Sequence, residues 1–202
     1  GDSIALVSDA GTPLISDPGF KLVRAAQAAG HSVTALPGAS AALAALIVAG
    51  LPTDRFFFEG FLPAKEGQRR ARIAEIARIP ASLILFETGP RLERALSDLA
   101  AGLGAREAAV CRELTKMYEE VRRGDLVTLA RDYASAPPPR GEIVIVIAPP
   151  AADTGALDAD AIDDMLRSAL TRASVKDAVA EVAAATGLAR REVYQRALAL
   201  KQ

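Results

Sequence analysis

The sequence predicts an α/β protein followed by a separate helical tail. Short apolar runs typical of buried strands alternate with amphipathic segments typical of helices as far as residue 147. Clusters of Gly and Pro separate these segments. After Ala148 the apolar density falls, and Pro149 and Pro150 begin a stretch rich in Ala and Asp. We therefore expect two α/β domains over residues 1–52 and 53–148, a linker over residues 149–158, and helices over residues 159–202.

The first α/β domain is predicted to contain a parallel sheet. Its opening residues 3–8 contain four consecutive apolar residues, two of them β-branched, which is typical of a buried parallel strand. The elements expected after it are a loop over 9–19, a helix over 20–29, a strand over 32–36 and a helix over 39–49. A central strand needs neighbours on both sides, so we expect further strands of this domain to precede Gly1.

The second domain and the tail follow the same reasoning. In the second domain we expect a mixed sheet with strands over 56–60, 82–86, 107–112, 117–123 and 142–147, and helices over 66–78, 90–103 and 126–133. The tail is expected to form helices over 161–173, 174–186 and 189–201. The joint between the last two resembles a helix–turn–helix, with Gly187 in the turn and Arg190 and Arg191 opening the final helix.

The composition excludes several classes of protein. The 202 residues contain 24 Lys and Arg against 25 Asp and Glu, which argues against a disordered chain and against a globally basic nucleic-acid binder. One Cys and one His, Cys111 and His31, leave no disulfide framework and no Cys/His zinc site. No apolar stretch reaches membrane-spanning length. We expect a cytoplasmic protein that needs neither a metal nor a membrane.

Two loops predict a small-molecule site. Residues 9–19 hold two Gly and two Pro and follow the first expected strand, at the sheet edge where open α/β sheets bind ligands. Hydroxyls are available there from Ser8, Thr12 and Ser16. The loop matches neither the P-loop nor the dinucleotide pattern. A second small-residue loop, 37–41, follows the next expected strand. The alternative is that the first loop only shapes a tight connection and the second is an ordinary helix entry.

Long motifs give these loops a family resemblance. The sequences LVSDAGTPLISDPG (6–19) and LPGAS (36–40) resemble those of the tetrapyrrole-methylase-like class III S-adenosylmethionine methyltransferases. Within that superfamily the chain is similar to the bacterial 16S rRNA cytidine 2′-O-ribose methyltransferases. Further matching segments are GLPTDR (50–55), FEGFLP (58–63), FETGPRL (86–92), RELTK (112–116) and GEIV (141–144). The resemblance implies S-adenosylmethionine as cofactor, 16S rRNA in the small ribosomal subunit as partner, and a homodimer. It also implies that part of the cofactor cleft precedes Gly1, which leaves the activity of this chain alone an open question.

The resemblance also assigns site residues. Those implied to contact the cofactor are Asp9, Gly11, Thr12, Pro13, Ser40, Ala41, Phe86 and the backbone at Ile145. Glu87 is implied to face the cofactor beside Phe86. A carboxylate near the sulfonium, from Asp9 or Glu87, would stabilise its positive charge. The alternative for both is that a carboxylate at a strand end caps the following helix.

Methyl transfer to a hydroxyl also needs a proton acceptor. The candidates are Glu87, Glu113, Lys116 and Glu119, and we favour the Glu113–Lys116 pair as neighbours of the acceptor hydroxyl. Lys116 acts as a base only if its pKa is depressed, whereas as a cation it holds a phosphate. The alternative is a solvated strand edge.

Contact with RNA is expected from local positive charge. Lys65, Arg69, Arg70 and Arg72 lie within eight residues, and Arg91 is expected to extend the patch, together with Arg112, Arg122, Arg123 and Arg140. The alternative is a solvated helix with internal ion pairs. Basic residues also outnumber acidic ones in the tail from Lys176 onward.

Two other functions remain open at this point. One is a sister methyltransferase that acts on a tetrapyrrole or another small acceptor. The other is a non-catalytic nucleic-acid-binding fragment that works through its helix–turn–helix tail.

Overall fold

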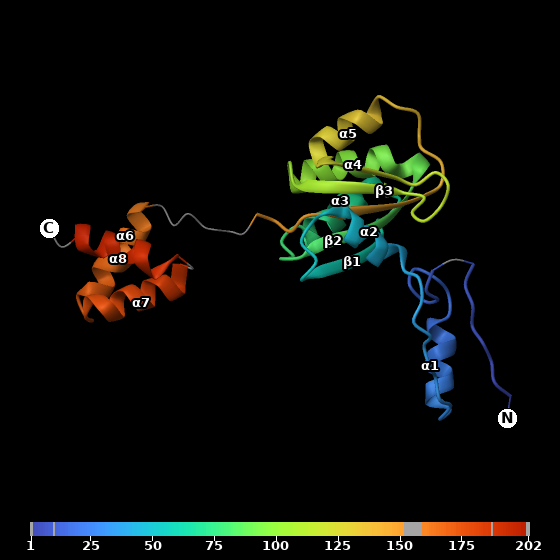
Figure 1. The fold of residues 1–202 in the computed structure, drawn as a ribbon, viewed down its shortest axis with the longest axis horizontal. Helices are drawn as coiled ribbons and strands as arrows, with labels where there is room; N and C mark the ends of the chain where they lie inside the picture. Colours follow the sequence, from blue (N-terminus) through green and yellow to red (C-terminus); the bar gives the residue numbers. More distant parts are fainter. Residues whose placement is uncertain (1, 10, 152–158, 187, 201–202) are drawn as a thin grey trace. The chain divides into compact units, whose positions relative to one another are not determined.

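The structure is a computed structural model that describes residues 2–9, 11–151, 159–186 and 188–200 (Figure 1). It divides into two compact units, Gly1–Pro150 and Ala151–Gln202, and each is described by itself. Most of the linker predicted over residues 149–158 lies outside the described residues, as does Gly187.

A five-stranded mixed sheet forms the centre of the first unit. Its spatial order is β1-β2-β5-β3-β4. The strands are β1 (Phe56–Phe61), β2 (Ser82–Thr88), β3 (Glu107–Arg112), β4 (Glu120–Asp125) and β5 (Glu142–Ile147). β1 and β2 run parallel, and the other neighbours are antiparallel. All five strands were predicted, but β4 begins three residues later than expected. The residues before it form a turn in which Glu113 and Thr115 have positive φ angles of 49° and 65°.

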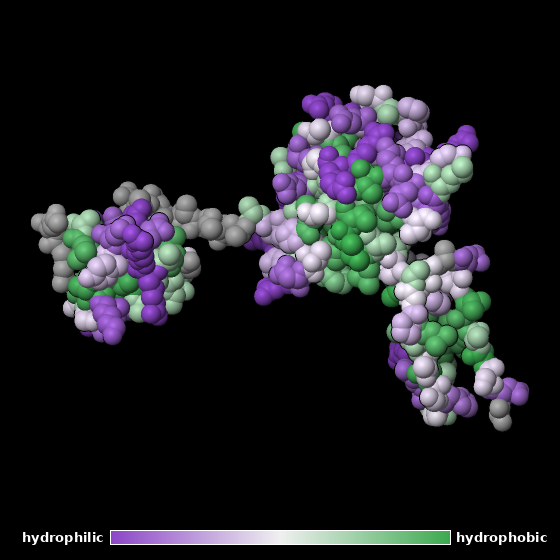
Figure 2. Space-filling model, viewed as in Figure 1, coloured by the Kyte–Doolittle hydropathy of each residue, from purple (hydrophilic) through white to green (hydrophobic). Residues whose placement is uncertain are grey.

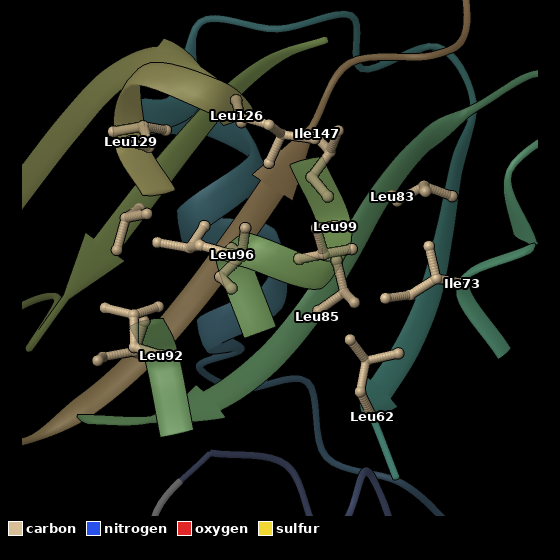
Figure 3. Close-up of a cluster of buried hydrophobic side chains, with 14 of the residues drawn as sticks. Leu62, Ile73, Leu83, Leu85, Leu92, Leu96, Leu99, Leu126, Leu129 and Ile147 are labelled. Atoms are coloured by element: carbon tan, nitrogen blue, oxygen red, sulfur yellow. The ribbon is translucent and has the colours of Figure 1, made fainter. Parts of the chain in front are cut away.

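Helices cover both faces of this sheet. The helices α3 (Glu66–Ile76), α4 (Gly89–Leu103) and α5 (Leu126–Ala134) pack on one face and form the larger core with Leu83 and Leu85 of β2 (Figure 3). The helix α2 (Ala41–Ala49) packs on the other face against side chains such as Ile84. This arrangement follows from the period-two alternation of strand side chains, which sends successive apolar residues of β2 to opposite faces.

The α2 helix is fixed at both ends. The Ser40 hydroxyl accepts a hydrogen bond from the Leu43 amide at 3.4 Å, which caps the first turn. At the other end, the Arg123 guanidinium donates to the carbonyls of Val48 and Ala49. These carbonyls lack partners within the helix, so a guanidinium is a favourable cap for them. Arg123 was predicted to extend an RNA-binding patch, and the structure instead commits it to this helix end.

The two strands expected in residues 2–40 are absent. Residues 3–8 and 32–36 pair with no strand of the described chain, and Ile4, Val7 and Leu36 are 89%, 81% and 88% exposed. A strand forms only where a neighbour accepts its backbone hydrogen bonds, and none of the five strands lies beside these segments. The helix predicted between them forms as α1 (Phe20–Ala28), but it buries none of its residues. The expected parallel sheet of the first domain is therefore not formed in the described residues.

The second unit contains three helices, α6 (Ala159–Leu170), α7 (Val175–Thr186) and α8 (Arg190–Ala199), close to the predicted positions. They surround their own apolar core, which includes Leu166, Val182 and Val193. Among the described residues of the whole chain, none of the helices combines the length and apolar character needed to cross a bilayer.

Candidate functional site

The two loops predicted to form a site lie together. The Thr12 hydroxyl of the first loop donates to the Ala39 carbonyl of the second at 3.0 Å. Within the first loop, the Ser8 hydroxyl donates to the Asp17 carboxylate at 2.5 Å. Leu14 and Ser16 have φ angles of 73° and 59°, in the region that non-glycine residues rarely adopt. The first loop is therefore held in a specific shape against the start of α2.

The first loop also reaches the end of strand β1. At Gly60, where φ is 74°, an added Cβ would lie 3.1 Å from the Ser16 hydroxyl oxygen and 4.0 Å from the Phe58 ring. A β-bulge separates Phe58 from Gly60 in the pairing with β2. Glycine inside a strand often marks a place where another backbone or a ligand approaches closely. Here it allows the hydroxyl-bearing loop to approach the sheet edge.

Three phenylalanines gather at this edge. The Phe86 ring lies 4.9 Å from Phe58 and 5.7 Å from Phe61, both in edge-to-face geometry. Phe61 remains 47% exposed. Gly60 and Phe61 were not among the predicted site residues, although a glycine within the aromatic run FFFEGF was the available signal. Hydroxyls, open loop backbone and exposed aromatic surface therefore meet at one end of β1 and β2.

Phe86 and Glu87 face opposite sides of the sheet. Phe86 packs with the α2 side, whereas Glu87 points to the α4 side, where its carboxylate accepts from the Thr88 amide at 2.8 Å and lies 3.2 Å from Arg91 Nε. Burial raises the pKa of Glu87, and the Thr88 amide and Arg91 partly offset that rise. The expectation that both residues face one ligand conflicts with strand alternation.

Ile145 is held within the sheet on all sides. It lies in the middle of β5, is 1% exposed, and pairs with Leu85 on one side and Val110 on the other. Its side chain belongs to the core on the α3–α5 face. The backbone groups of Ile145 that were predicted to contact a cofactor are therefore flanked by β2 and β3, whose hydrogen bonds compete with such a contact.

Glu113 and Lys116 form a compact ionic cluster with Glu142. Lys116 Nζ lies 2.9 Å from Glu113 Oε1 and 2.9 Å from Glu142 Oε2, and the Glu142 amide also donates to Glu113 Oε1 at 2.9 Å. The amide of Glu142 and the ammonium of Lys116 lower the pKa of Glu113. Hydrogen bonds to Glu113 and Glu142 raise the pKa of Lys116. The direction of this shift opposes the role of a base for Lys116 and supports that of a cation.

This cluster borders a surface pocket. The pocket is lined by Arg112, Glu113, Tyr118, Arg140 and Gly141. Gly141 has a φ angle of 100°, and a Cβ there would meet the Glu113 carboxylate at 2.5 Å. Only glycine therefore allows Glu113 to fold back under the pocket. Tyr118 is 66% exposed at its rim.

The arginines predicted to bind phosphate are mostly engaged within the protein. Arg69 is only 6% exposed and pairs with Asp98 at 2.6 Å, so it is not available to a phosphate. Asp98 also accepts from Arg70, and Glu59 accepts twice from Arg72. These carboxylates lie 13 to 29 residues away in the sequence, which is why a local count of charges missed them.

The other two residues predicted to bind phosphate, Arg91 and Lys65, differ from each other. Arg91 donates to the Leu62 carbonyl at 2.6 Å in addition to its pairing with Glu87. Lys65 is exposed and has no ion pair among the described residues. Internal pairing, the alternative to an RNA-binding patch, describes this region better. No cluster of three or more potential metal ligands occurs in the described part of the chain.

Comparison with known proteins places the chain in a family. Residues 1–130 match the model of the tetrapyrrole (corrin/porphyrin) methylases, and residues 155–201 match that of the RsmI C-terminal HTH domain. The ribosomal RNA small subunit methyltransferase I of Mesorhizobium japonicum is 46% identical over 202 residues, which are 100% of this chain and 68% of that protein. The protein of the same name from Xylella fastidiosa is 48% identical and covers 96% of this chain, with 71% of its own length matched.

Solved structures agree on the fold. The methyltransferase CobJ matches with a TM-score of 0.50 at 21% identity, over 69% of this chain and 62% of its own. Diphthine synthase matches with a TM-score of 0.51 at 19% identity, over 68% of this chain and 57% of its own. The chain spans about two thirds of the curated relatives above and somewhat less of these structures. From its sequence and its fold, the chain belongs to the tetrapyrrole methylase family of methyltransferases, among the relatives named ribosomal RNA small subunit methyltransferase I.

Proposed function

We propose that this chain belongs to an enzyme that transfers a methyl group from S-adenosylmethionine to the 2′-hydroxyl of a cytidine ribose in 16S rRNA. The observation that carries the proposal is similarity over the whole chain, at 46% identity across 202 residues, to a ribosomal RNA small subunit methyltransferase. The similarity includes the helical tail, which a separate family model matches. A cytoplasmic homodimer acting on the small ribosomal subunit is part of the same proposal.

The site at the first loop fits such a cofactor. Gly11 has a φ angle of 71°, and apart from its chain neighbours no atom of the described residues lies within 4 Å of the position of a Cβ, so its backbone is open to a ligand. Asp9, Thr12 and Ser40 offer a carboxylate and two hydroxyls for the polar parts of the cofactor, and Pro13 and Ala41 complete the two loops. Phe86 and Phe61 offer aromatic surface for a purine. When bound, S-adenosylmethionine supplies an electrophilic methyl group on a positively charged sulfur.

The Glu113–Lys116 cluster is proposed to hold the RNA rather than to accept the proton. Lys116 remains a cation because Glu113 and Glu142 stabilise its charge. Since these two carboxylates offset that charge, Arg112 and Arg140 of the adjoining pocket are proposed to supply the positive charge for a backbone phosphate. Glu113 is a positioning residue that fixes the ammonium of Lys116. Glu87, which is 3% exposed on the α4 side of the sheet and pairs with Arg91, is not proposed as the proton acceptor.

The test measures methyl transfer from radiolabelled S-adenosylmethionine to small ribosomal subunits and to naked 16S rRNA. It uses this chain and, in parallel, a form extended at its N-terminus. A 2′-O-methyl group blocks alkaline cleavage at the modified nucleotide, so its position can be mapped. Label in one cytidine supports the proposal. Label in a base rather than a ribose, or no label with either form, refutes it.

The same assay separates the two alternatives. A sister enzyme acting on a small acceptor would bind S-adenosylmethionine but leave rRNA unlabelled. A non-catalytic binder would bind RNA with an affinity that S-adenosylmethionine does not change. Calorimetric titration of the cofactor into both forms distinguishes these outcomes.

A further inference from the structure

The helical tail has basic residues of two kinds. Arg167, Arg172 and Arg196 form ion pairs with Asp164, Glu181 and Asp163. In contrast, Arg190 and Arg191 are exposed and have no ion pair with any described residue. Of the acidic residues in the tail, Asp163, Asp164 and Glu181 pair with other arginines. Glu192 lies in the first turn of α8, but among the described residues it forms no ion pair with Arg190 or Arg191.

Arg191 begins an exposed face of α8, and Arg190 lies beside that face at the start of the helix. Arg191, Tyr194, Gln195 and Leu198 follow the i, i+3, i+4, i+7 spacing of one helix face. All four are exposed, with Tyr194 at 46% and Leu198 at 45%. The opposite face carries Val193 and Ala197, which are both 0% exposed in the core of the unit. The outward face therefore combines positive charge, an aromatic ring and an amide, and no acidic residue lies within it.

We propose that this face of α8 is a second RNA-binding surface, which takes unpaired nucleotides of the rRNA substrate. The arginines match the charge of the phosphate backbone, and Tyr194 offers a ring on which a base can stack. Unpaired nucleotides are the fitting partner because the major groove of A-form RNA is too deep and narrow for side chains to read. The inference rests on the proposed function for the choice of RNA, and it assigns substrate binding to residues outside the site at the first loop.

The helix–turn–helix arrangement supports this choice of face. In that arrangement the second helix presents its N-terminal residues to nucleic acid, and α8 is the second helix here. Arg190 and Arg191 are its first two residues. The charge and the architecture therefore point to the same end of the same helix.

The test compares two double variants of equal charge. R190Q/R191Q removes the two guanidinium groups that form no ion pair with any described residue, whereas R167Q/R172Q removes two ion-paired ones from the same unit. Binding of a fluorescent single-stranded fragment of 16S rRNA is measured by fluorescence anisotropy. The salt concentration is varied from roughly 50 to 300 mM, a range that includes physiological ionic strength. Thermal unfolding followed by circular dichroism verifies that both variants fold.

We expect R190Q/R191Q to weaken RNA binding about tenfold. The slope of the logarithm of the association constant against the logarithm of the salt concentration should become shallower by about 1.4, because each phosphate of a single strand that is no longer neutralised contributes roughly 0.7. R167Q/R172Q should change the affinity less than about twofold, because each of those guanidinium groups already neutralises a neighbour. Replacing Tyr194 with Leu should cost about fivefold or more, while Y194F retains the stacking surface and the affinity.

Equal losses in the two double variants would show that net charge alone attracts the RNA, and would overturn the proposal. Tighter binding to duplex DNA of the same length, or no loss in R190Q/R191Q, would overturn it as well. These outcomes are independent of methyl transfer. If the parent chain methylates rRNA and R190Q/R191Q binds RNA as tightly as the parent, only this inference is refuted. If RNA binding depends on α8 but no methyl group is transferred, only the proposed activity is refuted.

Discussion

The sheet of the first unit and the segment before α2 differ sharply in packing, although both belong to the same unit. In the sheet, Ile84 and Ile145 are at most 1% exposed. In residues 2–40, Ile4 and Val7 are more than four-fifths exposed, and α1 buries no residue. Yet this loosely packed segment carries the loop proposed to bind the cofactor. The tightly packed part of the chain and the proposed cofactor loop therefore lie in different places.

Figure 2 shows hydrophobic residues on the surface of the segment that carries α1 and also on the part of the unit that contains the sheet. Buried apolar area is what offsets the entropy lost on folding. Substitutions in the sheet and its helices should therefore reduce stability, whereas substitutions in residues 2–40 should leave stability almost unchanged and affect ligand binding.

The largest effect is expected at Asp98, which pairs with the buried Arg69 and also accepts from Arg70. D98N should lower the free energy of unfolding by about 3–5 kcal/mol, because it leaves a buried guanidinium without its counter-charge. The matched control is E66Q, which removes an exposed carboxylate from Arg70 and should cost under about 1 kcal/mol. Urea unfolding measures both. Equal costs would contradict the assignment of Arg69 to an internal structural role.

Asp98 also predicts how stability depends on pH. Burial alone would raise the pKa of its carboxyl group, but hydrogen bonds from Arg70 and Arg69 lower it below the ordinary value of 3.8. Because the pKa is depressed in the folded state, the pair contributes stability above about pH 4 and loses it as the pH falls through the folded pKa. Between pH 5 and pH 2, D98N should lose less stability than the parent chain. Parallel acid titration curves would contradict this.

The next effect compares one apolar side chain from each region. Leu85 is 1% exposed within the larger core, so L85A should cost about 2–5 kcal/mol. Val7 is 81% exposed, so V7A should change stability by less than about 0.5 kcal/mol. Urea midpoints of the two variants measure the difference. A cost above about 2 kcal/mol for V7A would show that residues 2–40 pack more closely than their exposure indicates.

The two regions also differ in how far the sequence predicted them. Strands such as β5 were predictable because a run of β-branched residues has few stable alternatives to a buried strand. Residues 3–8 carry an equally apolar run, but a strand depends on pairing with a neighbour, and composition does not reveal whether the neighbour exists. Helices, which satisfy their hydrogen bonds locally, were predicted close to their observed ends throughout.

The site was predictable in its loops and less so in its charges. The Gly- and Pro-rich motif indicated the first loop, and the two loops expected to form one site are joined by the hydrogen bond from Thr12 to Ala39, which was not predicted. The partners of Arg69 and Arg72 were not predictable, since Asp98 and Glu59 approach them only through the packing of α3 against α4 and β1. Phe86 and Glu87 were expected to face one ligand, because the resemblance named a strand end, whereas strand alternation sends the two side chains to opposite faces of the sheet.

Thr12 lies in the poorly packed region and links the two loops, and its effect on stability should be as small as that of Val7. T12V removes only an exposed hydrogen bond to Ala39 and should cost less than about 0.5 kcal/mol. If the loops form the cofactor site, the same change should weaken S-adenosylhomocysteine binding by about fivefold or more, because it removes a hydroxyl and loosens the loop around Gly11. Calorimetric titration measures this. T34V, which also exchanges an exposed threonine of residues 2–40 but has no hydrogen bond from its side chain among the described residues, is the control and should bind like the parent chain. Equal affinities for T12V and T34V would separate the first loop from the cofactor. A selective loss at T12V would show that a region contributing little to stability contributes directly to ligand binding.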